Sequence, residues 1–268
     1  MNSKHKQKIG LVLGSGGLRG LAHIGVIKVL LKNNIPIDYI SGASAGSFVG
    51  SYLATHGEIE SFEKLILENT KDLLPLFFDF SLQGLVDGNK ISMFLKKILK
   101  DADFSETKIP FSVIATDLIT GQPAVFSKGK IVPAVRGSMS IPILFKPVSY
   151  QGKLLVDGGL SNPVPVGILK ENKIDKVIAV NLYHPNEFRN KKFTLTQIAL
   201  RSTRIALHNL SKVSVNQADV ILNPDVSYYL SKFKVTDYFK PENIKKIIMI
   251  GELEATRLLP EIKKLLKE

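Results

Sequence analysis

The 268-residue sequence predicts an α/β layer fold with a mainly parallel central sheet. Two observations predict it. Short apolar runs bounded by glycine, which are typical of buried parallel strands, alternate with segments whose apolar residues recur at helical spacing. Ile9–Leu13 is the first such run, and residues 21–33 are the first such helix, with a glycine-rich turn between them.

The same two patterns continue along the chain. Five further apolar runs are predicted to be strands, at residues 37–40, 111–115, 125–126, 154–156 and 176–181. Helices are predicted over Ala45–His56, directly after Ser44, and over residues 195–215 and 242–267. The stretch 58–99 is also mostly helical in pattern. No internal repeat, heptad pattern or Pro/Ser-rich linker divides the chain, so one domain with helical additions is expected.

Composition excludes several classes of function. The chain has no cysteine, which rules out a disulfide scaffold, cysteine-ligated zinc, an iron–sulfur cluster and a thiol nucleophile. Lysine and arginine outnumber the acids 36 to 24, and an excess of +12 fits a polyanionic partner, either nucleic acid or an anionic membrane surface. No nucleic-acid-binding module accompanies the charge, so a nucleic acid partner is not expected.

The start of the chain is basic, as in a signal peptide, but glycines and Arg19 interrupt the apolar run that follows. No apolar run reaches the roughly 18 residues that a membrane-spanning helix needs. We therefore expect a cytoplasmic protein.

The first motif with chemical meaning is Gly-Ala-Ser-Ala-Gly at residues 42–46, between a predicted strand and a predicted helix. A serine on such a tight turn is held in a strained conformation with its hydroxyl exposed, and the helix N-terminus places positive partial charge nearby. Gly42 and Gly46 allow the strand and the helix to approach closely. Ser44 is therefore the candidate nucleophile.

The second motif is the glycine-rich loop at residues 14–20, between the first strand and its helix. A dinucleotide site needs G-x-G-x-x-G here, with an acid at the end of the second strand. The third glycine comes one residue late, at Gly20, and the second strand ends without an acid, so a cofactor is not expected. The alternative is an oxyanion hole, in which the backbone N–H groups of Gly16 and Gly17 face a carbonyl oxygen over Ser44.

The third motif is Asp157-Gly158-Gly159, directly after a predicted strand. A serine nucleophile needs a base, and none of the five histidines follows the chain order of an α/β-hydrolase triad (His5, His23, His56, His184 and His208). His23, beside the glycine loop, is expected to have a core or supporting role. This absence favours Asp157 as the direct partner of Ser44.

In this order, the three motifs resemble the patatin-like phospholipase family, whose pattern is G-G-G-x-[RK]-G, then G-x-S-x-G, then D-G-[GA]. Ser15 stands where the family has its first glycine. Residues 115–121 look like a family strand and turn, and residues 136–147 look like the segment that leads to the family's aspartate. The resemblance spans roughly residues 9–181 and is closest to compact bacterial members near the neuropathy-target-esterase branch.

The resemblance implies a three-layer α/β/α fold and a metal-independent, cofactor-free serine esterase acting on fatty-acyl lipids such as phospholipids or lysophospholipids. Ser44 would be the nucleophile and Asp157 the general base, while Gly16 and Gly17 would hold the oxyanion. Gly20, Gly158 and Gly159 would support the motifs. Two alternatives remain open: a transacylase with the same acyl-enzyme, and a catalytically idle lipid-binding adaptor.

The sequence texture, together with the extent of the resemblance, divides the chain into three parts. These are a basic tail at 1–8, a patatin-like catalytic core at 9–182 with a lid-like helical insertion at 58–100, and an extension of helices and a strand at 189–268, packed on the same domain. The extension holds 15 basic and 8 acidic residues. The apolar stretch 73–80 is consistent with two structures, a lid that admits an acyl chain and dips into the bilayer, or the end of a core helix. The basic residues of the extension fit a solvated amphipathic helix and also a peripheral enzyme that contacts anionic membranes.

Two supporting roles are expected near the site. Arg19 would fix the glycine loop by bonding to backbone carbonyls, rather than steer a phosphate. Asp117 and Arg136 would form a buried support pair.

Overall fold

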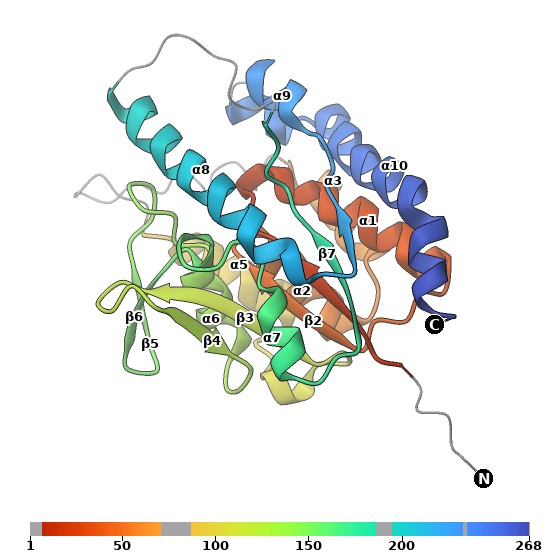
Figure 1. The fold of residues 1–268 in the computed structure, drawn as a ribbon. Helices are drawn as coiled ribbons and strands as arrows, with labels where there is room; N and C mark the ends of the chain where they lie inside the picture. The colour runs from red at the N-terminus through yellow and green to blue at the C-terminus, as the bar shows by residue number, and fades with distance from the viewer. Residues whose placement is uncertain (1–6, 71–86, 186–194, 233–234, 268) are drawn as a thin grey trace.

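The structure is a computed structural model that describes residues 7–70, 87–185, 195–232 and 235–267 (Figure 1). Its centre is an eight-stranded sheet with the order β5-β6-β3-β2-β1-β7-β8, in which β4 also pairs with β3. The strands are β1 (Ile9–Leu13), β2 (Tyr39–Ala43), β3 (Phe111–Asp117), β4 (Pro123–Phe126), β5 (Val148–Tyr150), β6 (Lys153–Val156), β7 (Lys176–Val180) and β8 (Val220–Leu222). The pairs from β3 through β2, β1 and β7 to β8 are parallel, which confirms the predicted α/β fold with a mainly parallel sheet.

Helices cover both faces of this sheet (Figure 1). They are α1 (Leu21–Lys32), α2 (Ala45–His56), α3 (Glu60–Glu68), α5 (Asn89–Leu99), α6 (Ile131–Ser138), α7 (Val166–Glu171), α8 (Leu195–Ser214), α9 (Ser227–Lys232) and α10 (Pro241–Leu265). The alternation of side chains along β1 explains the two layers. Leu11 and Leu13 join the large core under α1, α2, α6 and α10, whereas Val12 joins a smaller core with α7.

The structure differs from the sequence prediction in several elements. The second strand is Tyr39–Ala43 instead of residues 37–40, because Gly42 pairs with both β1 and β3 and Ala43 still pairs with β3. Four elements were not predicted: α6, α7, α9 and the β5 strand of an antiparallel hairpin. The three-residue β8 is the strand expected in the extension, for which no residues were predicted. The two C-terminal helices end at Ser214 and Leu265.

In the predicted lid-like insertion 58–100, the structure describes α3 and α5, and the apolar stretch 73–80 lies outside the described residues. Of the basic tail, only Gln7 and Lys8 are described. In the C-terminal extension, β8 pairs with β7 and so completes the central sheet. Within the described ranges, no helix has both the length and the apolar character that crossing a membrane requires.

The register of β3 explains how the ends of two strands come together. Thr116 pairs with Pro123 of β4 and with Val156 of β6, so β4 and β6 lie along opposite edges of β3. The edge used by β6 is the one that β2 uses up to Ile114, which pairs with Ala43. The chain after β2 and the chain after β6 therefore reach the same point on β3 from opposite directions. These chains begin with Ser44 and Asp157.

Candidate active site

Ser44 lies on a sharp turn between β2 and α2, with a backbone φ of +51°. For a residue with a side chain this conformation is unfavourable, by about 1–3 kcal/mol, and it persists only where the surroundings enforce it. They do so through Ser138, whose hydroxyl accepts a hydrogen bond from the Ser44 N–H at 2.7 Å and donates to the carbonyl of Ile114. The serine is thus anchored to α6 and β3 as well as to its own helix.

The glycines of the Gly-Ala-Ser-Ala-Gly motif allow backbone to pack directly on backbone. A Cβ on Gly46 would lie 1.9 Å from the carbonyl oxygen of Leu13, and one on Gly42 would lie 2.6 Å from the carbonyl oxygen of Gly46. Contacts below 3.0 Å are essentially never seen for real Cβ atoms. Helix α2 therefore starts immediately against the ends of β1 and β2, and any side chain at these two positions would displace it.

Asp157 follows β6 and is buried beside Ser44. The Ser44 hydroxyl donates a hydrogen bond of 2.6 Å to Oδ2 of Asp157, and the Gly159 N–H donates one of 2.8 Å to Oδ1. Burial raises the pKa of the Asp157 carboxyl to about 6, although both hydrogen bonds favour the charged form. The carboxylate is thus a stronger base than an exposed aspartate, and it already contacts the hydroxyl it would deprotonate.

The backbone of Asp157 is held as firmly as its side chain. Its N–H donates to the carbonyl of Ser140 at 2.9 Å, and its own carbonyl accepts from the Thr116 hydroxyl at 2.8 Å. Gly158 is packed tightly as well, since a Cβ there would lie 2.0 Å from the carbonyl oxygen of Ile114. The carboxylate therefore has little freedom to move away from Ser44.

The glycine-rich loop lines the same cavity. Gly17 has a φ of +56° and open space where a side chain would be. In the part of the chain that the structure describes, the N–H groups of Gly16 and Gly17 donate no hydrogen bond to a protein acceptor. They are the N-cap and the first residue of the short helix Gly17–Gly20, where N–H groups have no partner within the helix. These are the two donors expected from the sequence to face the oxyanion.

Arg19 is buried and holds the loop in place, as expected from the sequence. Its Nε donates to the carbonyl of Gly16 at 2.8 Å and its Nη1 to the carbonyl of Leu182 at 3.2 Å. The guanidinium also lies over the Tyr183 ring, 4.5 Å from the centroid. Gly20, next to it, leaves room for α2, since a Cβ there would lie 2.5 Å from that of Ala45.

His23 contacts the glycine-rich loop and is not a partner in the hydrogen bonds that Ser44 makes with Ser138 and Asp157. Its Nε2 contacts the carbonyl of Gly14 at 2.8 Å, and burial lowers its pKa to about 4. A neutral imidazole in the core matches the supporting role expected from the sequence. No histidine is among the described residues that line the cavity around Ser44.

Three contributors to the site were not identified from the sequence. Ser138 anchors the turn, Tyr183 hydrogen-bonds through its hydroxyl to Ser15 Oγ at 2.8 Å, and α8 forms one wall of the cavity. Ser138 lies in residues 136–147, which the family resemblance includes, but the sequence did not indicate that it anchors the turn at Ser44. Tyr183 and α8 follow the last strand of the resembling region, where no motif marks them.

Asp117 and Arg136 do not form the expected support pair. The Asp117 carboxylate accepts hydrogen bonds from the Ile119 N–H at 3.1 Å and the Thr120 hydroxyl at 3.1 Å, and Lys153 lies 3.7 Å away. Arg136 instead donates to the Ser140 hydroxyl and to the carbonyls of two residues that precede α5 (Asp87 and Gly88). The two residues lie on different elements, β3 and α6, and each has its hydrogen-bond partners elsewhere.

The cavity beside Ser44 has a volume of about 270 Å³ and a largely apolar wall. The glycine loop and the Ser44–Asp157 pair form one side. The other side is formed by residues 141–144, Leu160, Tyr183, Tyr238 and three residues of α8 (Thr203, Arg204 and Leu207). An elongated apolar group could occupy such a space with its end against the serine hydroxyl.

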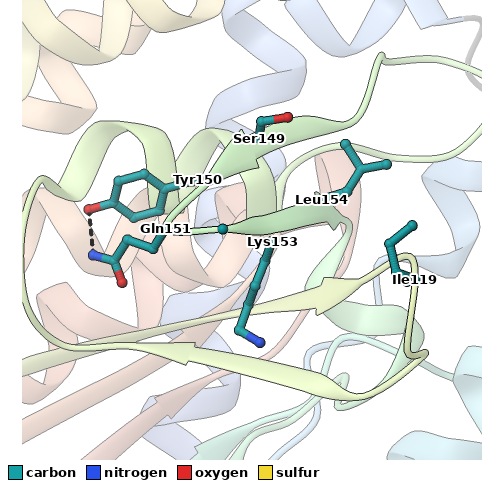
Figure 2. A pocket seen from close by; sticks show the side chains of 7 residues that line it. Ile119, Ser149, Tyr150, Gln151, Lys153 and Leu154 are labelled. Atoms are coloured by element: carbon teal, nitrogen blue, oxygen red, sulfur yellow. Dashed lines mark hydrogen bonds between the residues drawn. The ribbon is translucent and has the colours of Figure 1, made fainter.

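A second, wider hollow of about 540 Å³ lies beside the β5–β6 hairpin (Figure 2). Figure 2 shows Tyr150, Gln151, Lys153 and Ile119 around it, with the Gln151 amide donating to the Tyr150 hydroxyl at 3.1 Å. None of the candidate site residues lines this hollow. In the described ranges, no group of three or more histidine, aspartate or glutamate side chains is arranged to hold a metal ion.

Comparison with known proteins places this geometry in context. Residues 11–170 match the sequence model of a family described as patatin-like phospholipase. An uncharacterised NTE family protein of Mycobacterium tuberculosis is 34% identical over 177 residues, which cover 65% of this chain and 49% of that protein. The lysophospholipase NTE1 of Cryptococcus neoformans is 34% identical over 183 residues, which cover 66% of this chain and 11% of that protein. The chain thus spans about half the length of the mycobacterial relative and much less of the fungal one.

Among solved structures, VipD from Legionella pneumophila has a similar fold, with a TM-score of 0.51 and 15% sequence identity. The likeness covers 96% of this chain and 67% of that one. It therefore includes the C-terminal region beyond residue 170, which the family model does not reach.

Proposed function

The chain belongs to the patatin-like phospholipase family, and on that premise we propose that it is a serine lipid acyl hydrolase of the NTE branch. Its substrates would be fatty-acyl esters of phospholipids or lysophospholipids. The observation that carries the proposal is the 2.6 Å hydrogen bond from the Ser44 hydroxyl to a buried Asp157 carboxylate, at the end of an apolar cavity.

In the first half-reaction, Ser44 Oγ attacks the acyl carbonyl carbon while its proton passes to Oδ2 of Asp157. The distance between the two oxygens requires no rearrangement before the transfer. The tetrahedral intermediate then collapses: the ester C–O bond breaks, and the leaving alcohol takes the proton back from Asp157. The product is an acyl ester on Ser44.

Burial makes the aspartate suitable for this role. An aspartate with an ordinary pKa would be a weak base at neutral pH, whereas the pKa of about 6 narrows the gap to the operating pH. The carboxylate is still mostly ionised at pH 7, so the base is available. We therefore expect activity to rise with pH through about 6 and then to level off.

The negative charge on the carbonyl oxygen would be stabilised by the N–H groups of Gly16 and Gly17. Each preorganised donor of this kind is worth about 2.7–4 kcal/mol in a transition state. Arg19 contributes indirectly, because its bonds to Gly16 and Leu182 hold the loop that presents these donors. The N-terminus of α2 adds favourable partial charge at the serine.

In the second half-reaction, water attacks the acyl carbonyl and gives a proton to Asp157. Collapse of the second tetrahedral intermediate breaks the bond to Ser44 Oγ, which regains its proton from the aspartic acid. The fatty acid leaves, and the enzyme returns to its starting state without a metal or a redox cofactor.

Release of fatty acid from lysophosphatidylcholine and from diacyl phosphatidylcholine, quantified by mass spectrometry, tests the proposal. Wild type should release fatty acid, and Ser44→Ala should lose at least about 10³-fold of this rate. Ser51→Ala is the matched control. Ser51 is a buried serine in α2, the helix that follows Ser44, and its hydroxyl donates a hydrogen bond to the carbonyl of Phe48. This variant should retain the rate.

Two outcomes would redirect the proposal. Transfer of the acyl group to an added acceptor alcohol, in preference to water, would indicate a transacylase with the same acyl-enzyme. No turnover of any fatty-acyl ester by folded wild-type protein would refute the hydrolase and favour a lipid-binding adaptor.

A further inference from the structure

Two exposed apolar segments border the cavity that contains Ser44. The first is the loop tip 142–144 after α6, which lines the cavity and also reaches solvent. Ile143 is 51% exposed and Leu144 is 41% exposed. Ile143 has a backbone φ of +72°, a region that β-branched residues rarely enter. The loop therefore holds a large apolar side chain outward in an unfavourable conformation.

The tip does not collapse onto the core because its base is fixed. Phe145 is buried, its N–H donates to the carbonyl of Ile141 at 2.9 Å, and the Arg136 guanidinium lies 5.2 Å from its ring centroid. The Leu144 N–H also donates to the Ile141 carbonyl, at 3.2 Å. The exposure of Ile143 and Leu144 is thus a property of an anchored turn.

The second segment is α8, which contributes Thr203, Arg204 and Leu207 to the cavity wall. Ile198 and Ile205 are seven residues apart and lie on the opposite face of the same helix, where they are 49% and 43% exposed. The helix has three basic residues and no acidic one over its 20 residues (Arg201, Arg204 and Lys212). Helix α8 therefore combines exposed apolar side chains with basic residues and has no acidic residue.

Helix α10 shows that apolar exposure alone is not unusual in this chain. It packs beside α1 (Figure 1) and exposes Met249 and Leu253, by 49% and 61%. In contrast to α8, it contains four glutamates, and two of them flank Leu253 (Glu242, Glu252, Glu254 and Glu261). Its residues do not line the cavity of Ser44.

We propose that the tip 142–144 and the outer face of α8, with Ile198, Ile205 and Arg201, form a surface that docks on an anionic lipid bilayer. The inference rests on the proposed function in one respect, namely that the substrate is a bilayer lipid. Docking is a separate property, which can be measured on lipids that the enzyme cannot cleave.

The chemistry of this docking surface matches that partner. Apolar side chains on a cationic helix enter the boundary between headgroups and acyl chains, while basic residues stay with the anionic headgroups. Because the tip and α8 also line the cavity, docking through them would place the cavity next to the bilayer. A lipid could then reach Ser44 with less of its acyl chain exposed to water.

Sedimentation of the full chain with vesicles tests the proposal. The vesicles are made of ether-linked phosphatidylcholine, with or without ether-linked phosphatidylglycerol, so that no ester is present. The test variant is Ile198→Asp with Ile205→Asp, and the matched control is Met249→Asp with Leu253→Asp. Turnover of a soluble short-chain ester and the oligomeric state are measured on the same preparations.

We expect wild type to bind the anionic vesicles at least about tenfold more tightly than the neutral ones, and less tightly as salt is raised. The α8 variant should lose about tenfold or more of this binding, while the α10 variant binds like wild type. Ile143→Asp should weaken binding as well. Turnover of the soluble ester should be the same in wild type and the α8 variant.

Failure of wild type to bind the anionic vesicles, or equal binding by the α8 and α10 variants, would overturn the proposal. So would a change from dimer to monomer in the α8 variant with vesicle binding intact, since the face would then join two copies of this chain. If no preparation cleaves an ester but the binding contrast holds, the docking surface stands and the hydrolase proposal fails.

Discussion

The two sides of the Ser44 cavity are built in opposite ways. On one side, backbone packs on backbone: Gly46 contacts the end of β1, and Gly158 contacts β3, with no room for a side chain at either position. On the other side, the loop 141–144 and α8 line the cavity with side chains that are partly exposed. The backbone contacts fix the positions of Ser44 and Asp157. Side chains on the opposite wall can be substituted without moving these two residues. Chemistry and substrate choice should therefore be separable in this molecule.

The largest expected effect tests that separation directly. Ser44→Ala should reduce kcat by at least about 10³-fold, because it removes the atom that would form the acyl bond. Leu207→Ala, on the opposite wall, should change KM for long-chain substrates by less than about tenfold, since it removes only apolar contact. Steady-state kinetics on one lysophospholipid would check both. A loss of kcat in Leu207→Ala as large as that in Ser44→Ala would contradict the separation.

The tightness of the backbone side is tested by Gly46→Ala. The new methyl group would collide with the carbonyl oxygen of Leu13, so we expect a loss of roughly 3 kcal/mol or more in the free energy of unfolding. Gly167→Ala is the control, because Gly167 is in α7 and a Cβ there meets nothing within 4 Å. Urea denaturation should find the control unchanged or slightly more stable. Equal stability of the two variants would show that α2 can shift to accommodate a side chain.

The buried carboxylate is expected to reduce stability where it is charged. Since burial raises the folded-state pKa of Asp157 to about 6, its contribution to stability falls as pH rises from about 4 to 6 and stays low above that. Asp157→Asn should therefore be inactive, yet more stable than wild type at pH 7.5, by up to about 3 kcal/mol. The stability advantage should shrink as pH is lowered toward 5.

Asp117→Asn provides a control of opposite sign. The hydrogen bond from the Ile119 N–H, with smaller contributions from Thr120 and Lys153, lowers the pKa of Asp117. Its charged form therefore stabilises the fold above its unfolded-state pKa, and the variant should be less stable than wild type at pH 7.5. Chemical denaturation at several pH values would measure both. A loss of stability in Asp157→Asn at pH 7.5 would contradict the account of the buried base.

The smallest expected effect concerns Gly17. A Cβ fits there, so Gly17→Ala should cost only the strain of a φ of +56°, about 1 kcal/mol in the free energy of unfolding. If its N–H faces the oxyanion, even a slight change in backbone angle should lower kcat with little effect on KM. Thermal unfolding and kinetics on the same preparation would separate the two effects. An unchanged kcat would argue against a role for this donor.

The sequence predicted the backbone side of the site better than the side-chain side. At Gly42, Gly46 and Gly158, two backbone segments pack against each other without room for a side chain. A sequence can meet this requirement only with glycine, so the positions are visible as a motif. Tyr183 and Leu207, in contrast, belong to the cavity only because β7 and α8 bring them there, and no local pattern indicates it. The same distinction applies to the strands, since β1 and β7 were evident from their apolar runs whereas β8 has only three residues.

The expected Asp117–Arg136 pair illustrates a second limit. A buried support pair was predicted, but each side chain follows its own element. Asp117, at the end of β3, contacts the loop after that strand, and Arg136, on α6, contacts the residues before α5. The pairing of Ser44 with Asp157 was expected from the lack of a suitably placed histidine and from the family resemblance. Its physical cause, the two chains that converge on one edge of β3, became visible only in the strand register.

Covalent labelling with a fluorophosphonate is the most direct test of the central claim, that Ser44 is a nucleophile activated by Asp157. Wild type, Ser44→Ala and Asp157→Asn would be labelled at pH 7.5, with circular dichroism to verify folding and mass spectrometry to locate the adduct. We expect a single adduct on Ser44 in wild type, none in Ser44→Ala, and labelling slowed by at least about 10²-fold in Asp157→Asn. An adduct on another residue, or equal labelling of wild type and Asp157→Asn, would contradict the account.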